Sequence, residues 1–178
     1  MCRRLKGKAG FTLIEILIVI IVLGILAMII VPQITVSTDD AKVSTLQSDL
    51  SALRSAVEIY YAQHGNRYPG MTDSAGATNT AAAAAAVAMV AQMTRYTDAD
   101  GDVNAVKNTT FKYGPYIKGN TLPANPFNTT ANSSAVVCSD SASINAARSV
   151  TAGGAGWKFH FKTGILYAND AVTVRRNY

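Results

Sequence analysis

The N-terminal 31 residues constrain this chain more than any other part of it. A basic leader, residues 1–10, is followed by an apolar run of 21 residues, Phe11 to Val31, in which Glu15 is the single ionisable side chain. At about 1.5 Å per residue, a helix of this length spans roughly 30 Å, the thickness of the hydrocarbon core of a bilayer. The run therefore predicts a membrane-length helix rather than a buried helix of a soluble domain.

The charges of the leader predict how that helix is oriented. Arg3, Arg4, Lys6 and Lys8 all precede the apolar run. The positive-inside rule therefore keeps the N-terminus cytoplasmic and places the C-terminal part on the other side of the membrane. A secretory signal peptide is the alternative, but its apolar region is usually shorter and ends at small residues, which the exit at residues 32–34 does not match.

Placing the Glu15 carboxylate in lipid costs roughly 2.5–3.5 kcal/mol on insertion scales. A charged residue at such a position therefore indicates a function. The stretch Gly10-Phe11-Thr12-Leu13-Ile14-Glu15 resembles the class III signal of type IV pilins and type II secretion pseudopilins. That resemblance implies cleavage after Gly10 and N-methylation of Phe11 by a prepilin peptidase. In a filament, the Glu15 carboxylate of one subunit would pair with the new Phe11 amine of a neighbour. The alternative is that Glu15 only reaches the headgroups.

Two helix-weakening residues, Gly24 and Pro32, lie at or just beyond the apolar run. Glycine costs about 1 kcal/mol in a helix interior, and proline removes a backbone hydrogen bond. Similarity to helical pilin filaments implies that the helix between them melts during assembly, and a static kink is the alternative. Gly24 and Pro32 are therefore assembly candidates alongside Phe11 and Glu15.

Residues 33–64 read as an amphipathic helix that continues the apolar one. Its apolar residues recur every three or four positions, and these are Val43, Leu46, Leu50, Leu53, Val57 and Tyr60. This spacing predicts a single stripe that packs against the chain's own domain, since the heptads do not persist as a coiled coil requires. Gly65 is the expected C-cap, and Pro69 prevents the helix from resuming.

Residues 65–178 form the expected small globular domain. An alanine-rich helix is predicted over about 80–95, capped by Asn79 or Thr80. Residues 129–156 read as a polar surface excursion. A β-hairpin is predicted over about 156–168, because aromatic residues alternate there with Lys158, His160 and Lys162. Its aromatic residues, Trp157, Phe159 and Phe161, should close over the helix stripe.

These elements define the fold class and boundaries. The class is α+β, with a long N-terminal helix, a membrane half and an amphipathic half, packed on a small C-terminal domain with a short antiparallel sheet. The segments are the leader (1–10), the membrane or filament-core helix (11–32), the amphipathic helix (33–64) and the domain (65–178). A short edge strand is expected over residues 171–174.

Composition limits the function classes. The net charge is +5, with 16 basic and 11 acidic residues, but four basic residues lie in the leader. Its removal leaves 12 basic residues and a net charge of +1, so nucleic-acid binding is not expected. The cleaved chain keeps one cysteine, Cys138, which excludes an intramolecular disulfide. That cysteine is either a buried small side chain or a free thiol, and burial is favoured.

One acidic loop invites a metal prediction. Asp98, Asp100 and Asp102 alternate in sequence, and hard cations such as calcium prefer several oxygen ligands. The spacing does not fit an EF-hand, so a solvated acidic turn is the alternative. The histidines, His64 and His160, are expected at a helix end and on the outer face of a strand. No triad spacing or metalloprotease motif accompanies them, so no enzyme activity is predicted.

Further motifs in the body of the chain resemble a major pseudopilin of type II secretion. They are Tyr60-Tyr61-Ala62-Gln63-His64-Gly65, Tyr68-Pro69-Gly70, Gly114-Pro115-Tyr116-Ile117-Lys118, Leu122-Pro123 and Asn125-Pro126-Phe127. The resemblance implies a homopolymer assembled from the inner membrane, with a periplasmic domain. Its partners would be the prepilin peptidase and methyltransferase, an assembly platform with its ATPase, minor pseudopilins and membrane lipid. A type IV pilus subunit and a non-polymerising membrane-anchored binding protein are the alternatives.

Overall fold

The computed structural model describes residues 10–73, 75–79, 81–140 and 154–169, with side chains left undescribed at 29–37. The chain divides into two compact units, residues 1–41 and 42–178, and each is described by itself. Within the described part of the chain, no helix combines the length and the apolar character that a membrane crossing demands.

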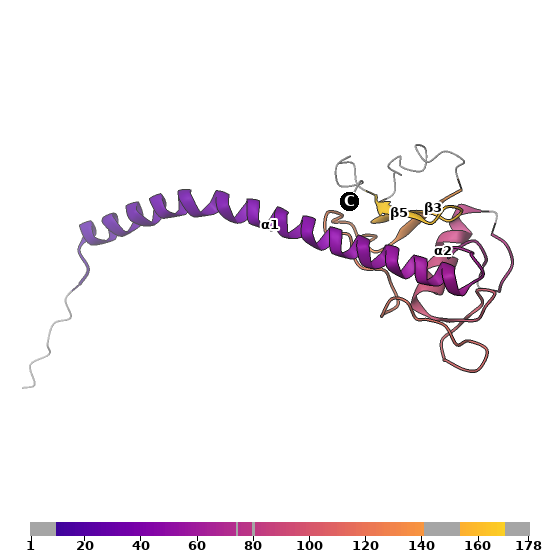
Figure 1. Cartoon of the computed structure of the whole chain (residues 1–178). Coiled ribbons are helices and arrows are strands. Elements are labelled where there is room, and N and C mark those ends of the chain that lie inside the picture. Colours follow the sequence, from indigo (N-terminus) through magenta and orange to yellow (C-terminus); the bar gives the residue numbers. More distant parts are fainter. Residues whose placement is uncertain (1–9, 74, 80, 141–153, 170–178) are drawn as a thin grey trace, which may run out of the picture. The chain divides into compact units, whose positions relative to one another are not determined.

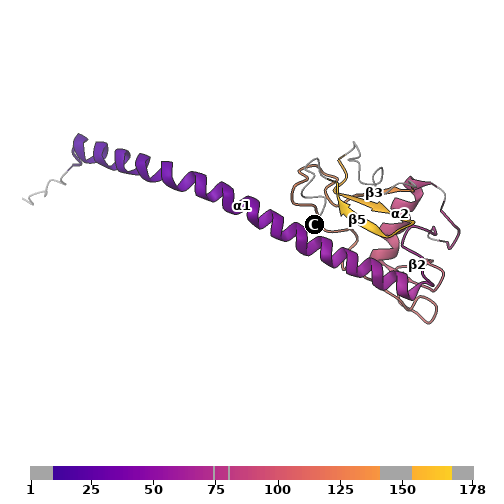
Figure 2. The same cartoon turned by 45° about the horizontal axis from the view of Figure 1, so that its top comes forward.

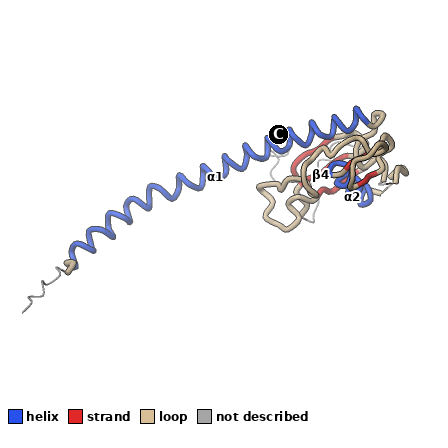
Figure 3. The backbone as a smooth tube through the Cα atoms, turned by 90° about the horizontal axis from the view of Figure 1, so that it is seen from below, coloured by secondary structure: helices blue, strands red, loops and turns tan. Residues whose placement is uncertain are grey.

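Helix α1 runs from Leu13 to Gln63 (Figure 3). Its backbone is helical at both Gly24 and Pro32. The single long helix that the sequence predicts is therefore confirmed. The predicted melting or kinking between these two residues stays a prediction.

The second unit is organised around the apolar stripe of α1. Leu46, Leu50, Leu53, Val57 and Tyr60 are each at most 2% exposed and belong to one core cluster. The cluster also contains Trp157, Phe159 and Phe161, which confirms that the aromatic strand residues close over the helix stripe. Burial of each large apolar side chain stabilises a fold by roughly 1.5–3 kcal/mol, so this contact is the core of the domain.

Helix α2, Ala82–Thr94, contributes to the same core as α1 and the aromatic strand residues. Ala85, Met89 and Met93 are buried in the cluster. The predicted cap at Asn79 is wrong: the N-cap is Ala81, with no side-chain hydrogen bond. The Asn79 amide nitrogen donates instead to the carbonyl oxygen of Gly70. The other predicted cap, Thr80, lies outside the described residues.

The strands form two small sheets. Strands β1, Tyr96–Thr97, and β2, Val103–Asn104, pair antiparallel. A three-stranded sheet has the order β3, Val136–Ser139, then β4, Trp157–His160, then β5, Ile165–Ala168. Strands β4 and β5 are the predicted hairpin, with Phe159 opposite Leu166. Figures 1 and 2 show β3 and β5 together in this sheet, with α2 beside it.

The sheet differs from the prediction in two respects. Strand β3 lies inside the segment expected to be a surface excursion, and it pairs parallel with β4, so the sheet is mixed rather than antiparallel. Both faces of β4 are buried: Lys158 and His160 are each 4% exposed. The expected outward position of His160 is therefore wrong. The predicted edge strand at 171–174 lies outside the described residues.

Candidate functional site

Glu15 has a local partner at the start of α1. The backbone N–H and the hydroxyl of Thr12 both donate to Glu15 Oε2, at 3.1 and 3.0 Å, and the Glu15 N–H is 3.3 Å from the Thr12 hydroxyl. Threonine before the first turn and glutamate three residues later satisfy each other's free donors, an arrangement known as a capping box. Glu15 thus fixes where α1 begins, a role that the sequence interpretation did not include.

The helix that Glu15 starts has uncovered apolar side chains. In the unit that contains it, the large apolar residues from Phe11 to Met28 are each at least 45% exposed. Phe11 and Leu13, beside the predicted cleavage point, are 82% and 86% exposed. Each such side chain gains roughly 1.5–3 kcal/mol when it leaves water, so this segment is built to be covered by lipid or protein.

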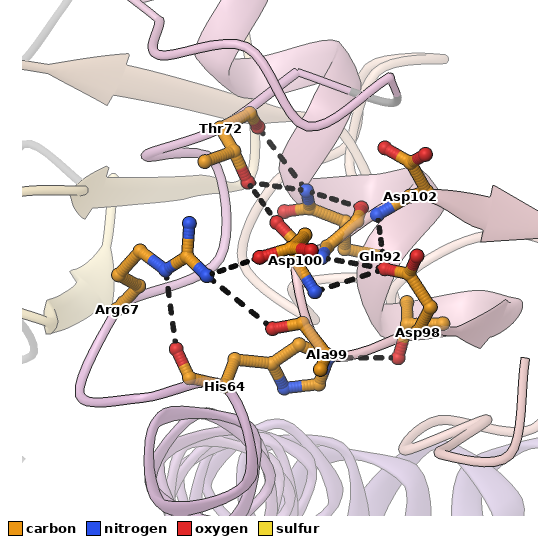
Figure 4. A network of polar contacts seen from close by, with 10 residues as sticks. His64, Arg67, Thr72, Gln92, Asp98, Ala99, Asp100 and Asp102 are labelled. Atoms are coloured by element: carbon orange, nitrogen blue, oxygen red, sulfur yellow. Dashed lines mark hydrogen bonds and ion pairs between the residues drawn. The ribbon is translucent and has the colours of Figure 1, made fainter. Parts of the chain in front are cut away.

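The predicted metal loop is an ordered turn. Asp98 Oδ1 accepts hydrogen bonds from the backbone N–H groups of Asp100, Gly101 and Asp102, each 3.0 Å away (Figure 4). Asp100 Oδ1 pairs with Arg67 Nη2, also at 3.0 Å. Two of the three predicted ligands are thus occupied by the turn itself and by a cation.

Asp102 differs from the other two carboxylates. Its Oδ1 is buried, and no hydrogen-bond partner reaches that atom within the described residues. Burial first, and then the neighbouring carboxylates of Asp98, Asp100 and Asp73, raise the pKa of Asp102. Across the described ranges, no group of three or more His, Cys, Asp or Glu side chains is arranged to hold a metal ion. Calcium at this loop stays a prediction.

Gln92 of α2 joins the two loops that carry these carboxylates. It is fully buried, and its Nε2 donates to the carbonyl oxygens of Gly101 at 2.9 Å and Thr72 at 3.1 Å, while its Oε1 accepts the Gly70 N–H at 2.8 Å (Figure 4). Gly101 has φ +98°, and a Cβ there would lie 2.6 Å from the Thr72 hydroxyl oxygen. Only glycine therefore fits this close approach.

His64 lies at the centre of the same region, not on its edge. Its side chain is fully buried and stacks on Tyr60, with ring centroids 3.7 Å apart. Nδ1 lies 2.8 Å from the Tyr60 carbonyl oxygen and Nε2 lies 3.0 Å from the Thr97 hydroxyl. A carbonyl can only accept, so Nδ1 carries the proton and Nε2 accepts from Thr97. Burial is the main cause that lowers the pKa of His64.

Cys138 is a buried structural residue, as favoured from the sequence. It is 4% exposed and belongs to the core cluster, and burial raises its pKa to about 12. A thiol in this state is a poor nucleophile at neutral pH.

The structure keeps the predicted residues in two separate groups. Phe11, Glu15 and Gly24 belong to the first unit, and the Asp98–Asp102 loop belongs to the second. Sequence reasoning missed Thr12 and Gln92. The Thr-x-x-Glu spacing before an apolar run could have revealed the first. No local pattern distinguishes Gln92, since its partners lie on two other loops.

Comparisons with known proteins agree with the N-terminal interpretation. Residues 5–31 match the family described as the prokaryotic N-terminal methylation motif. The chain is 45% identical over 55 residues to type II secretion system core protein G of Pseudomonas aeruginosa, covering 31% of this chain and 39% of that protein. The corresponding protein of Klebsiella michiganensis is 41% identical over 66 residues, or 37% of this chain and 46% of that protein.

A fimbrial protein of Pseudomonas aeruginosa is also similar, with 44% identity over 54 residues, which is 30% of this chain and 35% of that protein. The chain spans less than half the length of each of these relatives. No solved structure matches the chain. The predicted resemblance is confirmed: the chain carries a prepilin-type methylation motif, and its relatives are a secretion core protein and a fimbrial protein.

The Gln92 contacts predict a large loss of stability on substitution. Gln92→Leu leaves the carbonyl oxygens of Thr72 and Gly101 and the Gly70 N–H buried without partners. We expect the free energy of unfolding of the full chain, measured by urea denaturation, to fall by roughly 2–4 kcal/mol. Gln63→Leu is the matched control, because Gln63 is exposed and accepts one hydrogen bond, from Tyr116. An equal effect of both substitutions would contradict the role of Gln92.

Buried His64 predicts a loss of stability in acid. Because its folded-state pKa lies below the ordinary value of about 6.5, the unfolded chain binds a proton that the folded chain excludes. The stabilisation is complete above that value and falls as pH drops below it. Urea denaturation between about pH 5 and pH 8 should show this fall in the parent chain and a weaker one in His64→Phe. An unchanged pH dependence in the variant would contradict it.

Proposed function

We propose that this chain is the structural subunit of a type II secretion pseudopilus, a helical homopolymer assembled from the inner membrane to drive protein export. The observation that carries the proposal is the methylation motif at residues 5–31, together with the similarity to core protein G. The subunit has no catalytic role in this proposal, because it acts by packing against copies of itself.

Processing at the Gly10–Phe11 junction supplies the charge that assembly needs. Cleavage after Gly10 leaves a cationic amine on Phe11, which methylation retains as a cation. The carboxylate of Glu15 lies four residues further on, in the first turn of α1. Pairing between copies would satisfy both charges within an otherwise apolar bundle, whereas neither charge is stable there alone.

The apolar half of α1 serves two environments in turn. Before assembly its exposed side chains, from Phe11 to Met28, would lie in the inner membrane, with the N-terminus cytoplasmic and the domain periplasmic. After extraction, neighbouring copies would replace lipid around the same side chains. This cycle requires several partners. They are the prepilin peptidase that cleaves and methylates the chain, an assembly platform with its ATPase, and minor pseudopilins.

Two other functions remain as alternatives. A type IV pilus subunit, acting in adhesion, motility or DNA uptake, is supported by the similarity to a fimbrial protein. A membrane-anchored binding protein that does not polymerise would use the same helix as an anchor alone. The first alternative shares the assembly mechanism, and the second does not require the charge of Glu15.

Glu15 variants test the assembly mechanism and separate it from helix capping. Glu15→Leu removes both the charge and the capping box, and Glu15→Gln removes the charge but keeps an oxygen that accepts from Thr12. We expect both to lose filaments, because the Phe11 amine of a neighbour is left unpaired. Filaments are counted by electron microscopy, with mass spectrometry confirming that each product begins at Phe11.

Thr12→Val is the matched control, because it removes the hydroxyl of the capping box and leaves the Glu15 charge. We expect this variant to assemble. Normal assembly of Glu15→Gln would contradict charge pairing, and failure of Thr12→Val to assemble alongside it would show that filaments need capping instead. Absence of filaments from the parent chain, with membrane insertion unchanged in all three variants, would favour the non-polymerising anchor.

The predicted calcium site is tested separately. Asp102 Oδ1, which has no hydrogen-bond partner in the described part of the chain, and the surrounding carboxylates support a cation at residues 98–102. Since a ligand that binds the folded state stabilises it, calcium at about 1 mM should raise the melting temperature of the full chain. Asp102→Asn should abolish that rise. No difference between calcium and magnesium, or an unchanged response in the variant, would contradict the site.

A further inference from the structure

Strand β3 is an edge of the three-stranded sheet, and it lies against α2 (Figure 2). The Trp157 N–H donates to the Ala135 carbonyl oxygen at 3.1 Å, and β3 runs parallel to β4 with Val136 opposite Trp157. In a parallel pair, alternate residues of a strand direct both of their backbone groups at the partner. Val137 therefore faces β4, and the N–H and C=O groups of Val136 and Cys138 point away from it.

The two edges of this sheet differ in how their backbone groups are satisfied. On β5, the Leu166 carbonyl oxygen accepts from Arg54 of α1. On β3, the outward groups of Val136 and Cys138 make no hydrogen bond with any residue that the structure describes. Unpaired edge groups are a template for one more strand, because an extended chain beside them completes their hydrogen bonds.

A hollow of about 400 Å³ borders the β3 edge. Ala135 and Val136 line it on the strand side, and Val87 and Val90 are among the residues that line it from α2. The lining positions on α2 and its C-cap run from 86 to 95, which is roughly 13 Å of helix at about 1.5 Å per residue. An extended chain rises about 3.3 Å per residue, so roughly four residues of a strand fit along this hollow.

The side chains around the hollow define what such a strand would carry. Val87 is 74% exposed and offers an uncovered apolar surface. Arg95, at the C-terminal end of α2, and Asn120 also line the hollow, and both are exposed. Arg95 forms no ion pair with a described residue. Because a guanidinium group binds a carboxylate through charge-assisted hydrogen bonds, the hollow fits a chain that is apolar toward α2 and carries a carboxylate near Arg95.

We propose that the β3 edge and α2 form a docking groove for an extended peptide segment of another protein, which adds a fourth strand beside β3. Main-chain hydrogen bonds to Val136 and Cys138 would supply affinity, and the apolar wall of α2 together with Arg95 would supply specificity. The partner is thus an extended segment with apolar residues at alternate positions and a carboxylate within reach of Arg95. The inference goes beyond the proposed function, because it needs one subunit and no filament.

A peptide titration of the full chain in lipid nanodiscs tests this groove. The probe is a six-residue peptide that alternates valine and threonine and ends in a free carboxylate, and hydrogen exchange is followed by NMR. We expect the Val136 and Cys138 N–H groups to exchange more slowly when the peptide is bound, because they become donors in the new strand pair. The Val137 N–H already pairs with β4 and should not change.

Altered peptides separate backbone pairing from charge while the protein stays the same. In a strand, alternate amides point to opposite sides, so N-methylation of one alternate set should abolish binding and N-methylation of the other set should leave it. Replacing the C-terminal carboxylate with an amide should weaken binding to the parent chain roughly tenfold. The same replacement should have no effect on binding to Arg95→Gln.

Substitutions on α2 test the apolar wall of the groove. Val87→Asp should weaken binding of the peptide, because it places a charge against the apolar side chains of the added strand. Val106→Asp is the matched control, since Val106 is 67% exposed and does not line this hollow. Equal peptide affinities of the two variants would contradict a role for α2.

Several results would overturn the groove. They are no binding of the peptide, binding without slower exchange at Val136 and Cys138, and equal binding of the two methylated peptides. Slow exchange at Val136 before any peptide is added would also overturn it, because another part of the chain would then already hold the edge. These measurements do not depend on filaments, so a chain that binds the peptide but fails to polymerise would contradict the proposed function alone.

Discussion

The packing of the α1 stripe against the aromatic residues of β4 is the contact on which the rest of the domain depends. It joins Leu50 to Phe159, over 100 residues apart in the chain, within one dry cluster. Arg54 reinforces it from the rim, since its Nε and Nη2 both donate to the Leu166 carbonyl oxygen at 3.1 and 3.0 Å. Without this contact, α2 and the loops would have no apolar surface to close against.

At the C-terminal end of α1, buried polar side chains continue the apolar core. Tyr60 is buried, burial raises its pKa, and its ring covers His64. Gly101 passes close enough to Tyr60 that a side chain there would contact its hydroxyl. The loops are thus positioned by neutral, hydrogen-bonded groups. Buried neutral groups avoid the several kcal/mol that desolvating each ion costs, which agrees with the exposed position of Asp100 at the rim.

What could be predicted from sequence was local and periodic. The stripe from Leu46 to Tyr60 and the hairpin of β4 and β5 repeat at fixed intervals, and the leader motif is contiguous. Strand β3 could not be predicted, because it lies in a polar stretch and its pairing partner, β4, is about 20 residues away in the sequence. His64 lies at the helix end, as predicted, but its burial could not be predicted for a related reason. Thr97, Tyr113 and Tyr116 surround it, and no spacing in the helix reveals them.

The pairing proposed for Glu15 with a neighbouring copy does not conflict with its local role, because its two oxygens differ. Both Thr12 hydrogen bonds end on Oε2, and Oε1 has no hydrogen-bond partner within the described residues. An ionised carboxylate has about four acceptor positions, so one oxygen can hold the start of α1 while the other meets a neighbour's amine. A capped first turn also fixes the carboxylate in place before assembly, which lowers the entropic cost of pairing it. The capping box is therefore compatible with the proposed pairing of Glu15 rather than in competition with it.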